Sequence, residues 1–596
     1  MSSEQPQGAG SPRRDGSVSN ARSLTGPTTT YTPAAYSNAS NRDPRDSFDD
    51  VPPPVPPKDE IYSRPTTGST FKSQRTIKYG VGKYSKVELV PQPSDDPNDP
   101  LNWAPWRKDL CLGSLLMMAG LIAGMKTAFI TTNGAMAAPF GASFTAVANL
   151  TAAPLIISSF SGLISLICSK IWGKRPVYLV SFVFIFIGTM WNMTTNDNYG
   201  GTMGARVFQG LGWGGFDTLI LGSIQDMYFD HERDARVALY DIFATAIIWG
   251  SPLLGGLASN NANSFTVQFR IINTFYIVAI PLLVFGVPET SYIRSTSISP
   301  GAPSSTKSTF EQSTPLRLAT IFNKQRVRDC LYKIRPLSYK MEPDLCLLLQ
   351  GPRAFVTPTA GLIFALTMIP HASLWSFSQS LSLILAGPPL NLNPENIGGI
   401  MTAPWILAIM VISGFTLYRR RNPKPNTLLV VASIGVGSVL VMAGTLGFGF
   451  YTRDNLPLGR LNLPLLSFLA GLLAAGYYVL DATTEPLIIR SASFTCSNMT
   501  VTQRTIADMR AGVIIWRNLA AGIFVSTTPN AISTLPGLTA TLIGFTVVQA
   551  VLAAGIAAVW WFFGETIRRG DGTIMNLVDT SILKRPAAFP PAGSNV

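Results

Sequence analysis

Twelve windows of about 20 mainly apolar residues dominate this chain, and about 20 residues is the length that an α-helix needs to cross the hydrocarbon core of a bilayer. The first six windows are 109–131, 151–169, 176–195, 203–226, 236–258 and 268–287. The second six are 354–378, 397–417, 427–450, 462–488, 509–528 and 538–563. With 47% hydrophobic and only 13% charged residues, the composition also excludes an ordinary soluble globular protein. The sequence therefore predicts an all-α membrane protein of twelve transmembrane helices in two six-helix halves.

The windows divide the chain into five parts. We expect a disordered cytoplasmic N-terminal tail, a first six-helix half, a cytoplasmic central loop, a second six-helix half and a short cytoplasmic C-terminal tail, over residues 1–105, 106–288, 289–353, 354–565 and 566–596. The N-terminal tail is rich in Ser, Thr and Pro and lacks hydrophobic periodicity, so it cannot bury enough apolar surface to offset the entropy of ordering. Its first twenty residues lack the apolar region of a signal peptide. We therefore expect residues 1–95 to be dispensable for transport.

Basic residues set the expected orientation. They gather in the loops after the second, fourth, eighth and tenth windows, whereas the loop 132–150 carries no charge. Because Lys and Arg are retained on the cytoplasmic side of membrane proteins, these four loops are expected in the cytoplasm. Both termini then also lie in the cytoplasm, and we expect a multi-pass protein of the plasma membrane.

Several classes of function are excluded by what the sequence lacks. The net charge is +13, but no basic cluster is interleaved with aromatic residues, so no nucleic-acid partner is expected. Five cysteines form no Cys-x-x-Cys pair, so neither a metal site nor another cofactor is expected. Without a Walker A loop or a Gly-x-Ser-x-Gly elbow, and with two histidines in all, the chain is not expected to be an enzyme.

The expected partners are therefore a small-molecule substrate, protons and the lipid bilayer. In the tail, Pro53, Pro56 and Lys58 also fit a polyproline ligand of an SH3-type partner, although a plain solvated Pro-rich linker explains the same residues. Two halves of similar length and orientation are typical of a duplicated transporter, whose substrate site lies near the midplane between the halves. A duplicated channel is the alternative.

Short motifs add a family resemblance that covers roughly residues 96–569. Asp99-Pro100-Leu101-Asn102-Trp103 before the first window and Pro288-Glu289-Thr290 after the sixth resemble sequences of the fungal drug:proton antiporters with twelve spans, within the major facilitator superfamily. The resemblance implies the major facilitator fold.

Three further motifs are similar to signatures of that superfamily. Gly173, Lys174 and Arg175 match the loop between the second and third helices, although Lys170 stands where the family has an acid, so the role of that acid is not transferred. Any basic cytoplasmic loop would also fit. Gly250-Ser251-Pro252-Leu253-Leu254-Gly255-Gly256 resembles the antiporter motif of exporters, with Ser251 in place of a glycine. The resemblance implies that Pro252, Gly255 and Gly256 have a role in gating.

Arg206 begins the third of these motifs, Arg206-Val207-Phe208-Gln209-Gly210, whose arginine the resemblance implicates in proton coupling. A membrane-embedded arginine is expensive and is a functional candidate by default, with snorkelling to the membrane surface as the alternative.

Charged residues inside the windows are the other candidates for proton coupling. Asp217, Asp241, Asp481 and Glu485 are expected in the cytoplasmic half of the membrane, where they predict an acidic vestibule. Tyr477, Asp481 and Glu485 recur at helical spacing, so we expect them on one face, with the two carboxylates repelling each other. Glu485 could instead simply end its helix in water. Arg517 is expected on the inner side, where it could pair with one of these acids.

The candidate substrate cavity contains ring side chains and two further polar groups. Lys126 and His371 are expected in the outer half of the membrane, and His371 serves either a structural role or proton shuttling. Aromatic side chains of the second half could hold an apolar or cationic ligand, although most helical aromatics only pack; they are Trp375, Phe377, Trp405, Tyr477, Tyr478 and Trp516.

From these features the sequence predicts a proton antiporter that exports amphipathic small molecules, such as drugs, toxins or fungal secondary metabolites, by alternating access. Two alternatives stay open: a proton-coupled importer of polyamine-like or other organic cations, and a sensor on the same fold that does not transport.

Overall fold

Almost all of the described chain is helical. The computed structural model describes residues 78–80, 85, 86, 88–195, 198–262, 264, 266–292, 348–422, 427–495 and 499–575. Within these residues the extended structure consists of one isolated bridge between Tyr79 and Glu88. The all-α fold class predicted from the apolar windows is therefore confirmed.

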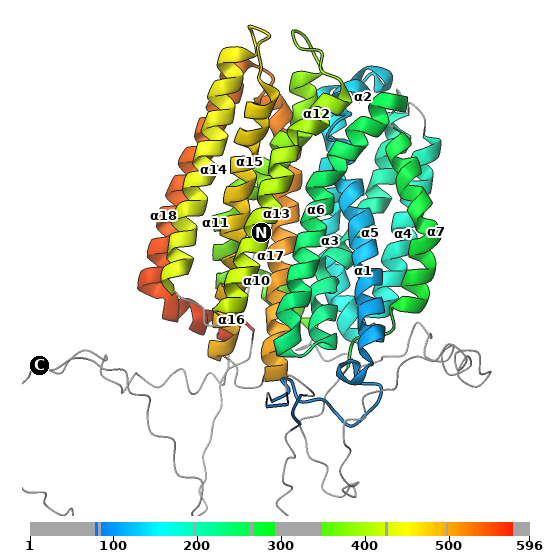
Figure 1. The fold of residues 1–596 in the computed structure, drawn as a ribbon, viewed down its shortest axis with the longest axis vertical. Helices are drawn as coiled ribbons and strands as arrows, with labels where there is room; N and C mark the ends of the chain where they lie inside the picture. The colour runs from blue at the N-terminus through cyan, green and yellow to red at the C-terminus, as the bar shows by residue number, and fades with distance from the viewer. Residues whose placement is uncertain are drawn as a thin grey trace, which may run out of the picture. The chain divides into compact units, whose positions relative to one another are not determined.

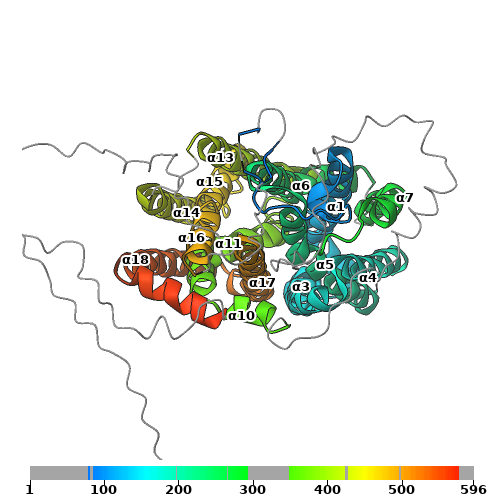
Figure 2. The ribbon, with the colours of Figure 1, turned by 90° about the horizontal axis from the view of Figure 1, so that it is seen from below.

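The helices form two groups. The first helix group contains α1 (Pro105–Thr127), α2 (Asn133–Phe140), α3 (Phe144–Trp172), α4 (Lys174–Thr194), α5 (Tyr199–Met227), α6 (Asp230–Ala262) and α7 (Val267–Gly286). The second helix group contains α10 (Gln350–Val356), α11 (Pro358–Leu385), α12 (Pro394–Ile400), α13 (Thr402–Arg421), α14 (Thr427–Asn455), α15 (Leu463–Asp481), α16 (Thr484–Thr495), α17 (Met499–Ala531) and α18 (Leu535–Ile574). The long helices run side by side, and α17 lies against α3 (Figures 1 and 2).

Eleven helical segments of the described chain are long and apolar enough to cross a membrane. Each of these segments covers one predicted window, and none of them covers the window 203–226. That window forms the 29-residue helix α5, in which several glycines and the polar residues Arg206, Gln209 and Asp217 interrupt the apolar run. The multi-pass membrane fold is thus confirmed, and the count of twelve spans stays a prediction.

Two predicted spans are interrupted. The window 397–417 is covered by α12 and α13, which meet at Met401, and the window 462–488 by α15 and α16, which are separated by Ala482 and Thr483. The second break corrects the expectation that Tyr477, Asp481 and Glu485 share one helical face. Asp481 ends α15 and Glu485 lies in the first turn of α16.

We call the end of the bundle where α3 ends at Trp172 and α4 begins at Lys174 the basic end, and it is the lower end in Figure 1. The short helices α2 and α12 lie at the opposite end (Figure 1). By the distribution of Lys and Arg, the basic end is the one we expect in the cytoplasm.

Close packing of α5 on α3 sets the depth of the polar residues on α5. A Cβ at Gly214 would lie 2.4 Å from the carbonyl oxygen of Ser158, so only glycine permits this approach. Two polar residues of α5, Arg206 and Asp217, are consequently held against neighbouring helices rather than against lipid. Arg206 is fully buried.

The last part of the predicted N-terminal tail is folded, which corrects the expectation of disorder up to residue 105. Leu89 and Leu101 are buried with Phe229, and the amide of Asp230 donates to the carbonyl of Val90 at 2.8 Å. Asp99 caps the short 3-10 helix η2 (Pro100–Asn102) by accepting from the amide of Leu101 at 3.1 Å. At the other terminus, α18 continues to Ile574, beyond the predicted boundary at 566. Pro53, Pro56 and Lys58 lie outside the described residues.

Candidate functional site

Arg206 lies at the centre of the first helix group with none of its side chain exposed. It donates to the carbonyls of Leu150 at 2.8 Å and Met125 at 3.0 Å, and to the side-chain oxygen of Gln209 at 2.8 Å. Its guanidinium lies 5.1 Å from the centre of the Trp213 ring. Within the described residues it makes no ion pair with a carboxylate. Complete burial rules out the snorkelling alternative, because the guanidinium is held by carbonyl dipoles and rings instead of reaching the membrane surface.

Trp213 connects Arg206 to an ion pair. Lys126 Nζ lies 5.6 Å from the centre of the Trp213 ring and 2.6 Å from a carboxylate oxygen of Asp217. We expected Lys126 and Asp217 in opposite halves of the membrane, but the pair places the two charged groups at one level. Asp217 also accepts from Asn518 of α17 at 3.0 Å, so this carboxylate is shared between the two helix groups.

Asp481 forms the corresponding ion pair of the second helix group. Arg517 Nη1 lies 2.6 Å from Asp481, and Arg517 also donates to the hydroxyls of Thr367 at 3.1 Å and Thr484 at 3.2 Å. The expectation that Arg517 pairs with an acid is therefore confirmed. Because Arg517 and Asn518 are consecutive on α17, one turn of this helix contacts both Asp481 and Asp217.

Aromatic rings and His371 form a cluster where α6 of the first group meets α11 and α15 of the second. The His371 ring lies 5.1 Å from that of Tyr477 and 6.2 Å from that of Trp375. Trp249 lies 5.7 Å from Trp375, and its indole N–H donates to the hydroxyl of Tyr478 at 2.8 Å. Neither imidazole nitrogen of His371 has a hydrogen-bond partner among the described residues. The sequence-predicted residues Trp375, Tyr477 and His371 are thus brought together, and Arg517 lies 5.8 Å from the Tyr477 ring.

The structure does not bring the other two predicted tryptophans to this cluster. Trp516 stacks on Phe355 at 4.2 Å and on Phe364 at 5.1 Å, and its indole N–H donates to the carbonyl of Phe355. Trp405 of α13 instead packs against Gly250 of α6, where an added Cβ would lie 3.1 Å from the indole nitrogen. Trp516 is therefore a packing residue, whereas Trp405 lies on the contact between the helix groups.

The predicted acidic vestibule is neutralised by basic partners, which corrects that expectation. Glu485 is paired with Arg419 and, at 3.3 Å, with Arg510. Arg510 also reaches Asp241 of the first group at 3.7 Å. Together with Lys126 and Arg517, these residues give every one of the four candidate acids a cationic partner. Glu485 therefore does not simply end its helix in water, and it does not lie beside Asp481 as an unpaired second carboxylate.

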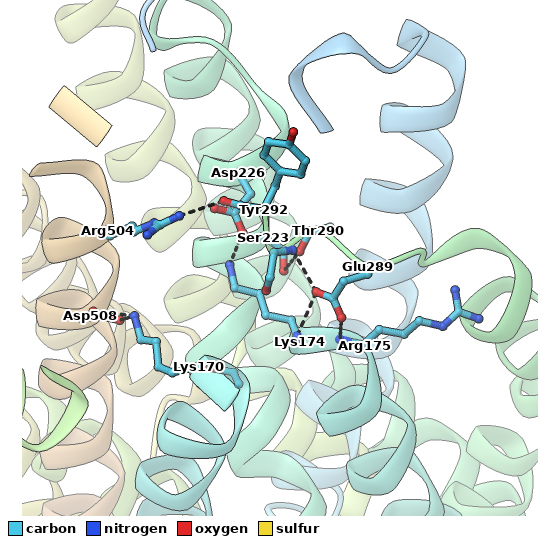
Figure 3. A network of polar contacts seen from close by, with 12 residues as sticks. Lys170, Lys174, Arg175, Ser223, Asp226, Glu289, Thr290, Tyr292, Arg504 and Asp508 are labelled. Carbon is cyan, nitrogen blue, oxygen red and sulfur yellow. Dashed lines mark hydrogen bonds and ion pairs between the residues drawn. The ribbon is translucent and has the colours of Figure 1, made fainter. Parts of the chain in front are cut away.

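Two motifs from distant parts of the sequence meet at the basic end (Figure 3). Gly173 has a φ of 90°, which favours glycine, and it separates α3 from α4. Glu289 accepts from the amides of Lys174 and Arg175, both at 3.0 Å, so its carboxylate caps the N-terminus of α4. The Lys174 side chain lies 2.6 Å from Asp226.

Lys170 forms an ion pair across the two helix groups. Its Nζ lies 2.8 Å from Asp508 of α17 (Figure 3). Lys170 stands where the family signature has an acid, so the basic partner of this contact lies on α3 and the acidic one on α17. Nearby, Arg504 donates to the carbonyl of Tyr292 at 2.8 Å, and the Tyr292 hydroxyl donates to Asp96 at 3.0 Å.

The motif of α6 packs on α12 at the opposite end. A Cβ at Gly256 would lie 2.4 Å from the carbonyl oxygen of Pro394, and one at Gly398 would lie 2.6 Å from the carbonyl oxygen of Pro252. Gly255 instead faces the side chain of Gln268 on α7. Asn133 of α2 also donates to the carbonyl of Gln379 on α11 at 2.8 Å. The two helix groups are therefore in contact at both ends.

Sequence reasoning missed Trp213, Trp249, Asn518 and Asp508. The rule that polar residues in an apolar window are functional candidates would have found Asn518, which directly follows Arg517. Asp508 was missed because it lies one residue before the window 509–528. Nothing in the sequence distinguishes Trp213 and Trp249 from the other tryptophans.

This arrangement defines a class of protein: a multi-pass α-helical membrane protein in which ion pairs lie both within and between two helix groups. The family model of the Major Facilitator Superfamily matches residues 115–558, and the chain belongs to this superfamily of membrane transporters.

Curated relatives agree with that assignment. An uncharacterized MFS-type transporter of Schizosaccharomyces pombe is 27% identical over 219 residues, which are 36% of this chain and 37% of that protein. Protein HOL1 of Saccharomyces cerevisiae is 26% identical over 241 residues, 39% of each chain. The MFS transporter cpaT of Aspergillus oryzae is 26% identical over 197 residues, 33% of this chain and 39% of that protein. The matches thus span about two fifths of the length of these relatives.

Proposed function

We propose that this membrane transporter is a proton-coupled exporter of amphipathic small molecules, working by alternating access of the two helix groups with both termini in the cytoplasm of a plasma-membrane protein. The observation that carries the proposal is the shared carboxylate of Asp217, which is paired with Lys126 in its own group and hydrogen-bonded to Asn518 of the other. Because this carboxylate is bonded to both helix groups, it can couple a conformational change of one group to the other.

The chemistry of two ion pairs with buried cations, Lys126 and Arg517, supports proton coupling. Protonation of Asp217 removes the charge that holds Lys126, and protonation of Asp481 does the same for Arg517. An uncompensated buried cation is unfavourable, so a proton on either acid favours a conformation in which water or another group reaches the cation. Because α17 contacts both acids, such a change moves a helix that lines the contact between the groups.

The aromatic cluster of Trp249, Trp375, His371 and Tyr477 is our proposed substrate-contacting surface. Its rings come from both helix groups, and such rings bind apolar and cationic ligands by stacking and cation–π contact. The same rings beside Asp481 also favour the alternative function, proton-coupled import of polyamine-like or other organic cations. The position of Arg517 over Tyr477 at 5.8 Å marks a place where a cation is already held.

Vesicle transport distinguishes the two directions. Purified protein is reconstituted into liposomes, protein orientation is determined by protease accessibility, and a pH gradient of either sign is imposed. Ethidium, spermidine and the neutral drug cycloheximide serve as probes. Export predicts that the probe leaves the side of the basic end while protons move toward that side. Probe movement in the direction of the protons would support import, and no gradient-dependent movement of any probe would contradict both functions.

A further inference from the structure

A polar cavity lies at the basic end, apart from the buried ion pairs that the proposed mechanism uses. Its volume is about 80 Å³, and its walls come from α3, α4 and α5 of the first group and from α10 and α17 of the second. A water molecule needs about 10–15 Å³ by the same measure, so the cavity has room for about five waters or one small ion with its hydration.

The lining of the cavity carries one more positive than negative charge. Lys170 and Lys174 are balanced by Asp508 and Asp226, with ion pairs of 2.8 and 2.6 Å. Arg504 also lines the cavity, and it donates to the carbonyl of Tyr292 but makes no ion pair with a carboxylate in the part of the chain that the structure describes. A half-buried guanidinium that lines a polar cavity without a carboxylate partner among the described residues favours an anion.

Two buried side-chain amides of the lining have unused hydrogen-bonding atoms. Gln503 is 5% exposed and Gln225 is 7% exposed. The Nε2 donor of Gln503 and the Oε1 acceptor of Gln225 have no hydrogen-bond partner among the described residues. Because an unpaired buried polar atom is unfavourable, a ligand that both accepts and donates hydrogen bonds would stabilise this site. Oxyanions that keep a proton, such as phosphate near neutral pH, have both properties.

We propose that this cavity binds a small, partly protonated oxyanion of the phosphate type. Its oxygens accept from Arg504 and Gln503, and its hydroxyl donates to Gln225. Because Gln225 belongs to the first helix group and Gln503 and Arg504 to the second, the bound anion stabilises the contact of the two groups at the basic end. The anion is either free phosphate or the phosphomonoester headgroup of an acidic lipid, which share this chemistry.

Thermal unfolding of the purified full-length protein tests the proposal independently of transport. In lipid-free detergent, inorganic phosphate is titrated against chloride at constant ionic strength. We expect a saturable rise of the midpoint of roughly 2 °C with phosphate. Arg504→Gln and Gln503→Leu should each abolish the rise. Arg420→Gln, which removes an exposed arginine at the end of α13, is the matched control and should keep it.

Nanodiscs distinguish the two sources of the phosphate group. The same melts are run in phosphatidylcholine with and without phosphatidic acid. A rise with inorganic phosphate assigns the site to the free ion, and a rise only with phosphatidic acid assigns it to the lipid, provided in each case that Gln503→Leu removes it. No rise with either probe, or a rise that both variants retain, would overturn the proposal.

Discussion

Asp217 and Asp481 are the two residues on which proton coupling depends in our proposal. Replacing either with Asn keeps the shape of the side chain but leaves Lys126 or Arg517 without its ion-pair partner. Losing a charged hydrogen-bond partner costs about 1–3 kcal/mol, so we expect transport to fall roughly tenfold or more and its dependence on pH to flatten. Initial transport rates between pH 5.5 and 8.0 measure this. Glu565→Gln, which breaks an exposed ion pair on α18, is the control. An unchanged pH profile in both Asn variants would assign the acids to packing.

Arg206 calls for a different substitution. Arg206→Ala would leave two carbonyls and a large cavity behind, so it tests folding as much as transport. Arg206→Lys keeps the charge but cannot contact Leu150, Met125 and Gln209 together, because an ammonium lacks the planar fork of donors. We expect Arg206→Lys to reach the membrane at normal levels, to bind substrate and to lose roughly tenfold in gradient-driven flux. Normal flux would mean that charge alone suffices at this position.

At the scale of the helical elements, the contact between α6 and α12 provides the clearest test of whether the two helix groups must pack closely at the end opposite the basic end. Gly256→Ala adds one Cβ, which would lie 2.4 Å from the carbonyl of Pro394, whereas a Cβ at Gly361 of α11 would meet no atom within 4 Å. We expect Gly256→Ala to hinder closure and to slow transport about fivefold or more, since a packed core cannot absorb such an overlap without shifting. Gly361→Ala should transport normally. Equal transport rates of Gly256→Ala and Gly361→Ala would show that close packing of α6 on α12 is not needed for transport.

The N-terminal segment is the second element with a testable role. Deletion of residues 1–77 removes none of the contacts described, so we expect normal surface expression and transport. Deletion of residues 1–95 removes Leu89, which packs beside Phe229. It also removes Ser94, which is hydrogen-bonded to Asp99 and Tyr292. We now expect this longer deletion to lower the amount of folded protein, measured as the monodisperse fraction in size-exclusion chromatography. Equal yields from both deletions would contradict the packed role of residues 88–95.

The elements themselves could largely be predicted from the sequence, because a run of apolar residues long enough to span a bilayer has few alternatives to a helix. The break at Ala482 and Thr483 was missed, although Pro486 is a signal for it: proline has no amide hydrogen to donate to the carbonyl of Ala482, four residues earlier, and its ring disfavours a continuous helix there. The folded segment before α1 was missed for a different reason. Its stability comes from Phe229, which is far away in the sequence.

The candidate site was predictable in its members but not in their pairing. A charge inside an apolar window is conspicuous, which is how Asp217, Asp481, Lys126 and Arg517 were found. Which acid holds which base depends on contacts between residues 91 positions apart for Lys126 and Asp217 and 36 apart for Arg517 and Asp481. Because the sequence does not reveal these pairs, it predicted an acidic vestibule, whereas the structure gives each of these acids a basic partner.

At the scale of the whole molecule, the ion pair of Lys170 and Asp508 connects the two helix groups at the basic end. Lys170→Asp or Asp508→Lys alone would place like charges opposite each other where an ion pair of 2.8 Å now stands, so each should weaken the contact of the helix groups at this end. The double exchange restores opposite charges, and we expect it to recover most of the lost transport, with a coupling of about 0.5–3 kcal/mol in a double-mutant cycle. Arg453→Asp, in an exposed pair on α14, is the control. If the losses of the two single variants simply add in the double variant, this ion pair does not hold the two helix groups together during transport.

Substrate-driven proton movement is the most direct test of proton-coupled transport through the shared ion pairs. Liposomes containing the purified protein and an internal pH-sensitive dye start with equal pH on both sides, and an outward gradient of ethidium, spermidine or cycloheximide is then imposed. We predict that at least one probe changes the internal pH, and that neither Asp217→Asn nor Asp481→Asn supports this change while Glu565→Gln does. Probe transport without any change of internal pH in the wild-type protein would contradict proton coupling.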